Sequence, residues 1–108
     1  MNLDPLAVNE ELKKALETEL AALGALLGTQ SNKKMAFEQA RSQAAAGVDS
    51  KGKPPSEAYC DRVASGDATY LAQCAQELSC NMEHRRAGIM VEYLRNVFQA
   101  ALAAAQPR

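Results

Sequence analysis

Apolar residues recur at three-, four- or seven-residue intervals along much of this chain, and no segment alternates strictly between apolar and polar positions. Such spacing draws apolar stripes down α-helices, whereas strands would need a period of two. Valine and isoleucine are scarce and alanine is abundant, which also favours helices. The pattern predicts an all-α fold, a small bundle of three or four helices with a long C-terminal helix, in a single helical domain covering residues 1–108.

The longest patterned stretch runs from Asp67 to Ala105, as one helix or as two helices broken near Ser79–Asn81. Asp67 follows Gly66 and suits an N-cap, because its carboxylate can accept free backbone N–H groups. One stripe consists of Leu71, Ala75, Leu78, Met82, Ile89, Tyr93 and Val97. A second row, rotated from the first by roughly 100° or more, consists of Met90, Leu94, Phe98 and Leu102. One face can pack on the protein's own core, and the other needs a further surface.

A first helix is predicted for Leu3–Gly28, with Asp4 as its cap and Pro5 at the first helical position, where a missing N–H costs nothing. A second helix follows and extends to Gly47. The two can also continue as a single bent rod, because Thr29–Asn32 is only a modest breaker. A narrow leucine stripe marks the first helix, at Val8, Leu12, Leu16, Leu20, Leu23 and Leu27.

Residues Gly47–Ser56 are predicted to form a surface loop, since two glycines, two prolines and polar residues cannot continue a helix. Ser56 or Pro55 then opens a short helix, Glu57–Ser65. The turn after it leads into the long C-terminal element.

Both apolar rows have two interpretations. The C-terminal row is either buried on two sides of a bundle, or it enters the groove of a protein partner. In the second case the partner-binding residues are Met90, Tyr93, Leu94, Phe98 and Leu102. The leucine stripe either packs on the other helices or forms a self-association seam that gives a homodimer. The residues of that seam are Leu12, Leu16, Leu20, Leu23 and Leu27.

Three cysteines do not make the even set of a secreted disulfide framework. If Gly66 and Asp67 form the tip of a helical hairpin, Cys60 lies opposite Cys74, and the two can form a disulfide when oxidised. Buried free thiols that act as small apolar groups are the other interpretation.

The spacing of Cys60, Cys74, Cys80 and His84 overlaps that of Cys3His zinc fingers, which makes a small zinc or nucleic-acid-binding module the alternative function. A continuous helix weakens it, because Cys74 and Cys80 would then point roughly 120° apart. A helix-turn-helix over Val63–Leu94 lacks a turn glycine and basic character. No catalytic signature appears, so we expect neither an enzyme nor a cofactor.

The charge balance and the N-terminal sequence indicate where the protein is found and what it does not bind. The chain has 12 Lys and Arg against 13 Asp and Glu, and a net charge of −1 argues against direct nucleic-acid binding. The N-terminus lacks a basic start followed by an apolar run, and no apolar stretch approaches the ~20 residues of a membrane span. We therefore expect a soluble, cytoplasmic protein.

With these residues laid out, the chain resembles the quorum-sensing antiactivators, small helical proteins that mask another protein. The resemblance covers the overall length, the leucine-striped first helix, and a second half from Tyr59-Cys60 through Cys74 and Cys80 to the apolar Ile89–Phe98. It implies non-enzymatic binding to the ligand-binding region of a LuxR-type transcription regulator. Such binding would block dimerisation of the regulator, and hence its binding to DNA.

Overall fold

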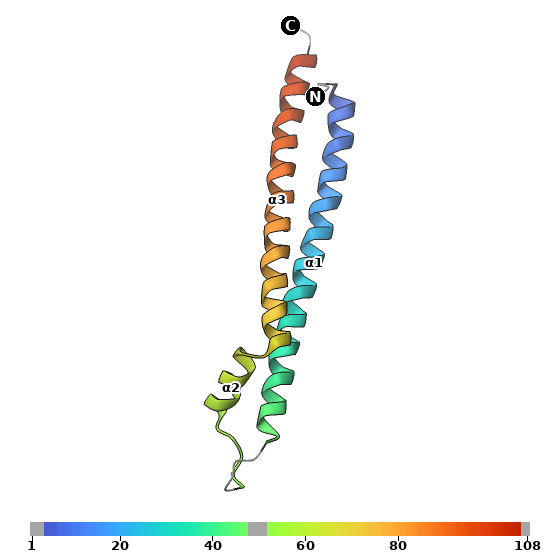
Figure 1. Ribbon diagram of the computed structural model, residues 1–108. Coiled ribbons are helices and arrows are strands. Elements are labelled where there is room, and N and C mark those ends of the chain that lie inside the picture. Colours follow the sequence, from blue (N-terminus) through green and yellow to red (C-terminus); the bar gives the residue numbers. More distant parts are fainter. Residues whose placement is uncertain (1–3, 48–51, 107–108) are drawn as a thin grey trace. The chain divides into compact units, whose positions relative to one another are not determined.

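The computed structural model describes residues 4–47 and 52–106, and every regular element within these ranges is an α-helix. The helices are α1 (Pro5–Ala45), α2 (Glu57–Ser65) and α3 (Ala68–Ala105) (Figure 1). The all-α prediction and the long C-terminal helix are confirmed. None of the helices in the described ranges has a stretch apolar enough to cross a membrane.

Helix α1 runs for 41 residues without interruption, through the position where a break was predicted. The prediction of two helices is wrong here, and the continuous alternative is confirmed; the predicted start at Leu3 lies outside the described residues. Gly28 keeps a helical backbone, and Thr29 next to it is only 7% exposed. The packing of buried residues of α1 such as Thr29 outweighs the cost of about 1 kcal/mol that a glycine brings to a helix interior.

Local sequence sets the starts of the other two helices as predicted. The Tyr59 backbone N–H donates to Ser56 Oγ (3.1 Å) at the start of α2. The Tyr70 N–H donates to Asp67 Oδ2 (3.0 Å) at the start of α3, which then continues without a break through Ser79–Asn81. Of the predicted loop, residues 48–51 lie outside the described ranges, and the remainder is non-helical.

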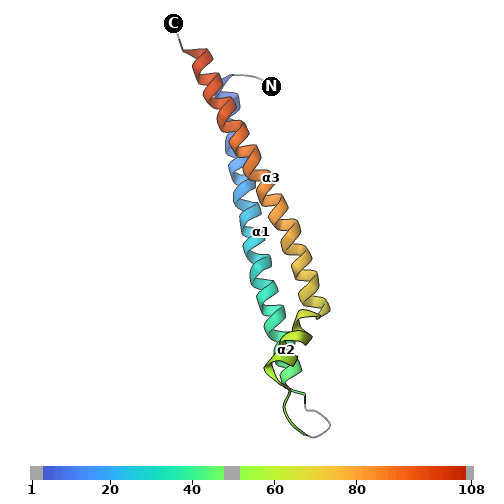
Figure 2. The ribbon, with the colours of Figure 1, turned by 90° about the vertical axis from the view of Figure 1, so that its left-hand side faces the viewer.

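Contacts within the chain divide it into two units, and α1 and α3 contribute to both. The first unit joins Met1–Ala25 to Cys80–Arg108, and the second is Leu26–Ser79. In the first unit, the beginning of α1 and the end of α3 run antiparallel, side by side (Figures 1 and 2). Its described residues include no third helix, so the first unit is a helix pair, where a bundle was predicted.

A narrow seam holds the first unit together. Its centre is a cluster of Ala15, Val91 and Leu94, with Leu12 packed against it. Buried and half-buried residues recur along both helices at steps of three and four, at Val8, Leu12, Ala15, Glu19 and Ala22 of α1 and at His84, Ala87, Val91, Leu94, Phe98 and Ala101 of α3. This seven-residue repeat is typical of a coiled-coil pair.

The second unit packs α2 and the beginning of α3 on the later part of α1. Cys60 and Ala64 of α2 are buried. The rings of Phe37 and Tyr70 meet edge to face, with centroids 5.2 Å apart. Ion pairs add to this packing, with Arg41 Nε 2.7 Å from Asp61 Oδ1 and Lys33 Nζ 2.8 Å from Glu77 Oε1.

Replacing Gly28 tests the continuity of α1. A β-carbon at Gly28 meets nothing within 4 Å, so Gly28→Ala should raise the free energy of unfolding by about 0.5–1 kcal/mol. Urea unfolding followed by circular dichroism measures this. Gly52→Ala is the control: with φ of +74° it should bring no gain. A loss of stability in Gly28→Ala would instead place a helix end at this glycine.

Candidate protein-binding surface

The seam divides the predicted partner-binding row of α3. Leu94 is 5% exposed and Phe98 is half-buried, whereas Met90, Tyr93 and Leu102 are exposed. Four residues turn a helix by about 400°, so each step of four moves the row about 40° around the axis. Its middle therefore lies in the seam and its two ends lie outside. Leu94 belongs to the protein's own core and is not available to a partner while the pair is intact.

Most of the other stripe of α3 faces solvent. In the first unit Met82, Ile89 and Tyr93 are exposed, Ile89 at 63%, whereas Val97 is half-buried. Leu71 and Leu78 in the second unit are exposed as well. The described residues of the first unit thus present an α3 apolar face, which consists of Met82, Ile89, Met90 and Tyr93.

The predicted self-association stripe divides in the same way. Leu12 packs against the seam, and Leu27, in the second unit, is exposed. Between them the seam passes to Ala15, Glu19 and Ala22, which leaves the larger leucines beside it. They form an α1 leucine face, which consists of Leu6, Leu16, Leu20 and Leu23.

The leucines Leu16 and Leu23 and the methionine Met90 lie on opposite edges of the helix pair. In a seven-residue repeat abcdefg with the seam at a and d, Leu16 and Leu23 occupy position e, and Met90 occupies position g. In an antiparallel pair the e positions of both helices flank one edge and the g positions flank the other. Gly88 of α3 is also at e, and a β-carbon there would lie 3.1 Å from Glu19 Oε2 of α1, which supports this register.

Of the two interpretations of the cysteines, the structure has the free thiols at Cys60, Cys74 and Cys80, and not the Cys60–Cys74 disulfide. Cys60 is buried and lines an open hollow of about 470 Å³ together with Arg41 of α1. Cys74 lies instead near Lys33, where it adds to the effect of Glu77 in raising the pKa of Lys33. Lys33 and Arg41 are eight residues apart on α1, about 12 Å along its axis. Cys60 and Cys74 thus pack at different levels of α1, whereas bridged Cα atoms lie within about 7 Å.

The zinc alternative has no structural support. Within residues 4–47 and 52–106, no three His, Cys, Asp or Glu side chains are placed to hold a metal ion. His84 is half-buried and takes a position in the seam of the first unit, and Cys60 and Cys74 belong to the second unit.

Four side chains form a polar cluster in the second unit, namely Lys33, Tyr70, Cys74 and Glu77. The hydrogen bond from Lys33 Nζ to Glu77 Oε1 (2.8 Å) raises the pKa of Lys33. A side-chain hydrogen bond with Cys74 favours the protonated Tyr70 hydroxyl and raises the pKa of Tyr70. In both residues the folded state favours the protonated form.

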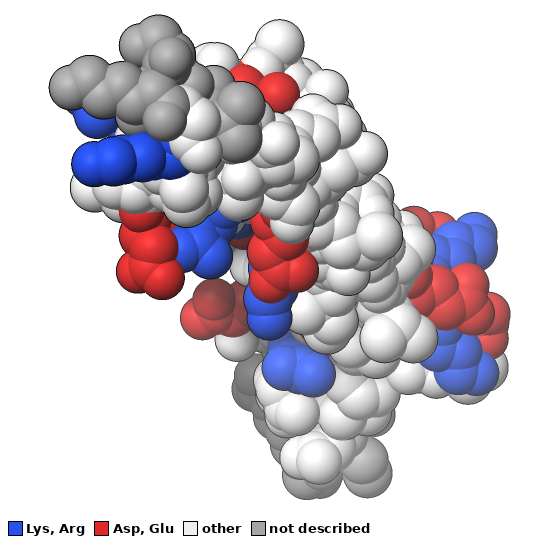
Figure 3. Space-filling model, turned by 90° about the horizontal axis from the view of Figure 1, so that it is seen from below, with Lys and Arg blue, Asp and Glu red and all other residues white. Residues whose placement is uncertain are grey.

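Charged side chains mostly neutralise one another along the helices. Ion pairs join Lys13 to Glu10 at 3.4 Å, Lys14 to Glu11 at 3.5 Å and Arg86 to Glu83 at 3.1 Å. On the face that Figure 3 shows, basic and acidic side chains lie next to one another in mixed clusters. This arrangement is typical of a solvated surface and differs from the basic stripe that nucleic-acid binding requires.

No protein-family model, curated protein or solved structure matches this chain. The resemblance to the quorum-sensing antiactivators accordingly stays a prediction.

Truncating Leu94 tests whether it belongs to the core. Because Leu94 is 5% exposed, Leu94→Ala should lower the free energy of unfolding by about 2–3 kcal/mol. Ile89→Ala on the outer side of the same helix should change it by less than about 0.5 kcal/mol. Urea unfolding of both variants measures the difference. Equal effects would mean that the two helices do not pair through this seam.

The polar cluster predicts a loss of stability at alkaline pH. Because the pKa values of Lys33 and Tyr70 are raised in the folded state, their contribution is complete at neutral pH and disappears as the pH rises through the raised values. The free energy of unfolding should fall above about pH 10, and fall less in Tyr70→Phe. Urea unfolding at about pH 8 and about pH 11 measures this. Tyr93→Phe should behave as the wild type, and a wild-type stability independent of pH would contradict the expectation.

Proposed function

We propose that this protein acts without catalysis, by binding another protein through the α3 apolar face and masking a surface that its partner needs. One observation carries the proposal. The seam of the first unit encloses only part of the apolar surface of α3: Val91 and Leu94 are buried, while Met82, Ile89, Met90 and Tyr93 are exposed. Large apolar side chains gathered on a polar surface are a mark of interaction sites.

The composition of the α3 apolar face suits a protein interface. Met90 is flexible and polarisable and adapts to irregular surfaces. Tyr93 combines a large apolar ring with a hydroxyl that can reach water, and tyrosine is enriched where interfaces bind most strongly. The ion pair between Glu83 and Arg86 lies on neighbouring turns and supplies a polar rim. Tyr93 follows Met90 by three residues and Ile89 by four, which is the spacing of a helix that lies in an apolar groove.

The partner we propose is a LuxR-type transcription regulator in the cytoplasm. Support comes from the resemblance to the quorum-sensing antiactivators, which work by covering such regulators. Binding of the helix pair to the ligand-binding region would exclude the second subunit of the regulator sterically. The regulator would then lose its DNA binding, and this protein would need no contact with DNA.

A pull-down from lysate of the native host, in the presence of reductant, tests the proposal. The double variant Met90→Glu/Tyr93→Glu places two charges on the α3 apolar face without touching the seam. A partner identified by mass spectrometry should bind this variant at least about tenfold more weakly than the wild type. If the partner is a LuxR-type regulator, adding the wild-type protein should abolish its DNA band shift, and adding the double variant should not.

Gln99→Glu provides the matched control, because it adds a charge to an exposed position of α3 outside this face. It should retain the partner as the wild type does. A double variant that retains the same proteins in the same amounts would overturn the proposal. A retained regulator that still binds DNA would overturn the masking mechanism.

A further inference from the structure

Three residues of the α1 leucine face, Leu16, Leu20 and Leu23, form a row that is symmetric about its own middle. Leu16, Leu20 and Leu23 follow one another at steps of four and three, and Leu20 is 70% exposed. Read in the reverse direction, the row again presents leucine at each step. It can therefore pack on the same row of a second α1 that runs antiparallel to it, with Leu16 near Leu23 of the second copy.

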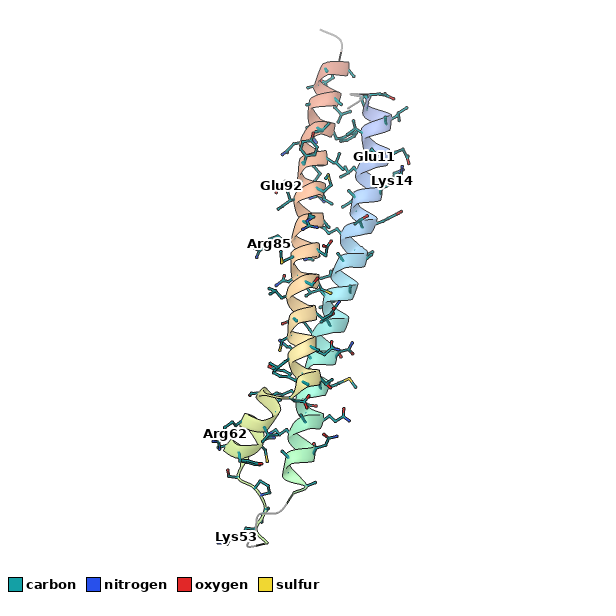
Figure 4. The ribbon with its side chains drawn as sticks, in the orientation of Figure 1. Glu11, Lys14, Lys53, Arg62, Arg85 and Glu92 are labelled. Atoms are coloured by element: carbon teal, nitrogen blue, oxygen red, sulfur yellow. The ribbon has the colours of Figure 1, made fainter. Side chains whose placement is uncertain are left out.

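Two charges of α3 have the same symmetry on the same edge of the pair. Arg85 and Glu92 are seven residues apart at position b, next to the e edge, and therefore about 10.5 Å apart along the helix. Figure 4 shows both on one side of α3, directed away from α1. Neither has an ion-pair partner among the residues that the structure describes. An inverted copy of α3 would place Glu92 opposite Arg85, and Arg85 opposite Glu92.

A single two-fold axis can relate both helices of the pair to the same helices of a second copy. The middle of the row between Leu16 and Leu23 lies at Glu19 and Leu20, and the middle between Arg85 and Glu92 lies at Gly88. These midpoints are at the same level of the helix pair, since a β-carbon at Gly88 would lie 3.1 Å from Glu19 Oε2. A single two-fold axis through this level therefore relates leucine to leucine and arginine to glutamate.

We infer that the e edge of the first unit, which carries Leu16, Leu20 and Leu23 of α1 and Arg85 and Glu92 of α3, binds a second copy of this chain. The two copies form an antiparallel, two-fold symmetric dimer. The leucines supply the apolar contact, and two reciprocal ion pairs between Arg85 and Glu92 of the second copy set the direction. A two-fold contact requires a self-complementary surface, and both rows meet that requirement at one level. The inference is independent of the proposed function, because Met90 and Tyr93, the residues that test that function, lie toward the other edge and stay open in the dimer.

Charge reversal gives the sharpest test of the full-length protein. By sedimentation equilibrium, we expect a wild-type dimer. Arg85→Glu alone and Glu92→Arg alone should each raise the dissociation constant of the dimer about tenfold, because each replaces two attractions by two repulsions. The double variant Arg85→Glu/Glu92→Arg should restore the wild-type constant. Restoration identifies the pairing between copies, since the double variant keeps the net charge.

Leu20→Glu should make the protein monomeric without loss of helicity, because this leucine is exposed in the single chain. Tyr93→Glu is the matched control, with the same kind of change at an exposed residue on the other edge of the pair, and should leave the dimer intact. Glu19→Gln should tighten the dimer, because the two copies of Glu19 approach each other near the axis. A monomeric wild type, or a double charge variant no tighter than the single ones, would overturn the inference.

Discussion

The contact between small residues of α1 and the apolar seam of α3 is the constraint on which the first unit depends. Ala15 lets the two helices approach, and Val91 and Leu94 fill the space beside it. Two long helices that meet along one line can bury only one narrow stripe each. The seven-residue repeat of that stripe keeps it facing the partner helix over several turns, and it selects which apolar residues are enclosed.

The same constraint leaves large apolar side chains outside. A leucine row that advances by four residues at each step moves around α1 and leaves the line of contact, so Leu12 is enclosed while Leu20 is exposed. On α3 the corresponding drift encloses Leu94 and exposes Met90. Both helices consequently carry two apolar stripes, one for the chain itself and one for another surface. This division is the physical basis for treating the protein as a binding module.

The second unit is held together by polar as well as apolar contacts. Here Lys33 and Glu77 face each other on facing helices, and Phe37 meets Tyr70 edge to face. A charged pair of this kind, which is still partly exposed to solvent, adds less stability than apolar packing. Small α2 completes the unit by burying Cys60 and Ala64, which places a free thiol inside the protein.

By itself, the sequence determined the helical class, the short α2 with its Ser56 cap, and the start of α3 at Asp67, because these follow from interactions between near neighbours. It also showed that α1 and α3 have more apolar surface than one contact can cover. Only the tertiary structure decided that α1 continues through Gly28, and that Leu94 is core while Ile89 is surface. A helix with two apolar stripes does not reveal from its own residues which stripe meets its neighbour, since that choice depends on the register between segments far apart in the chain.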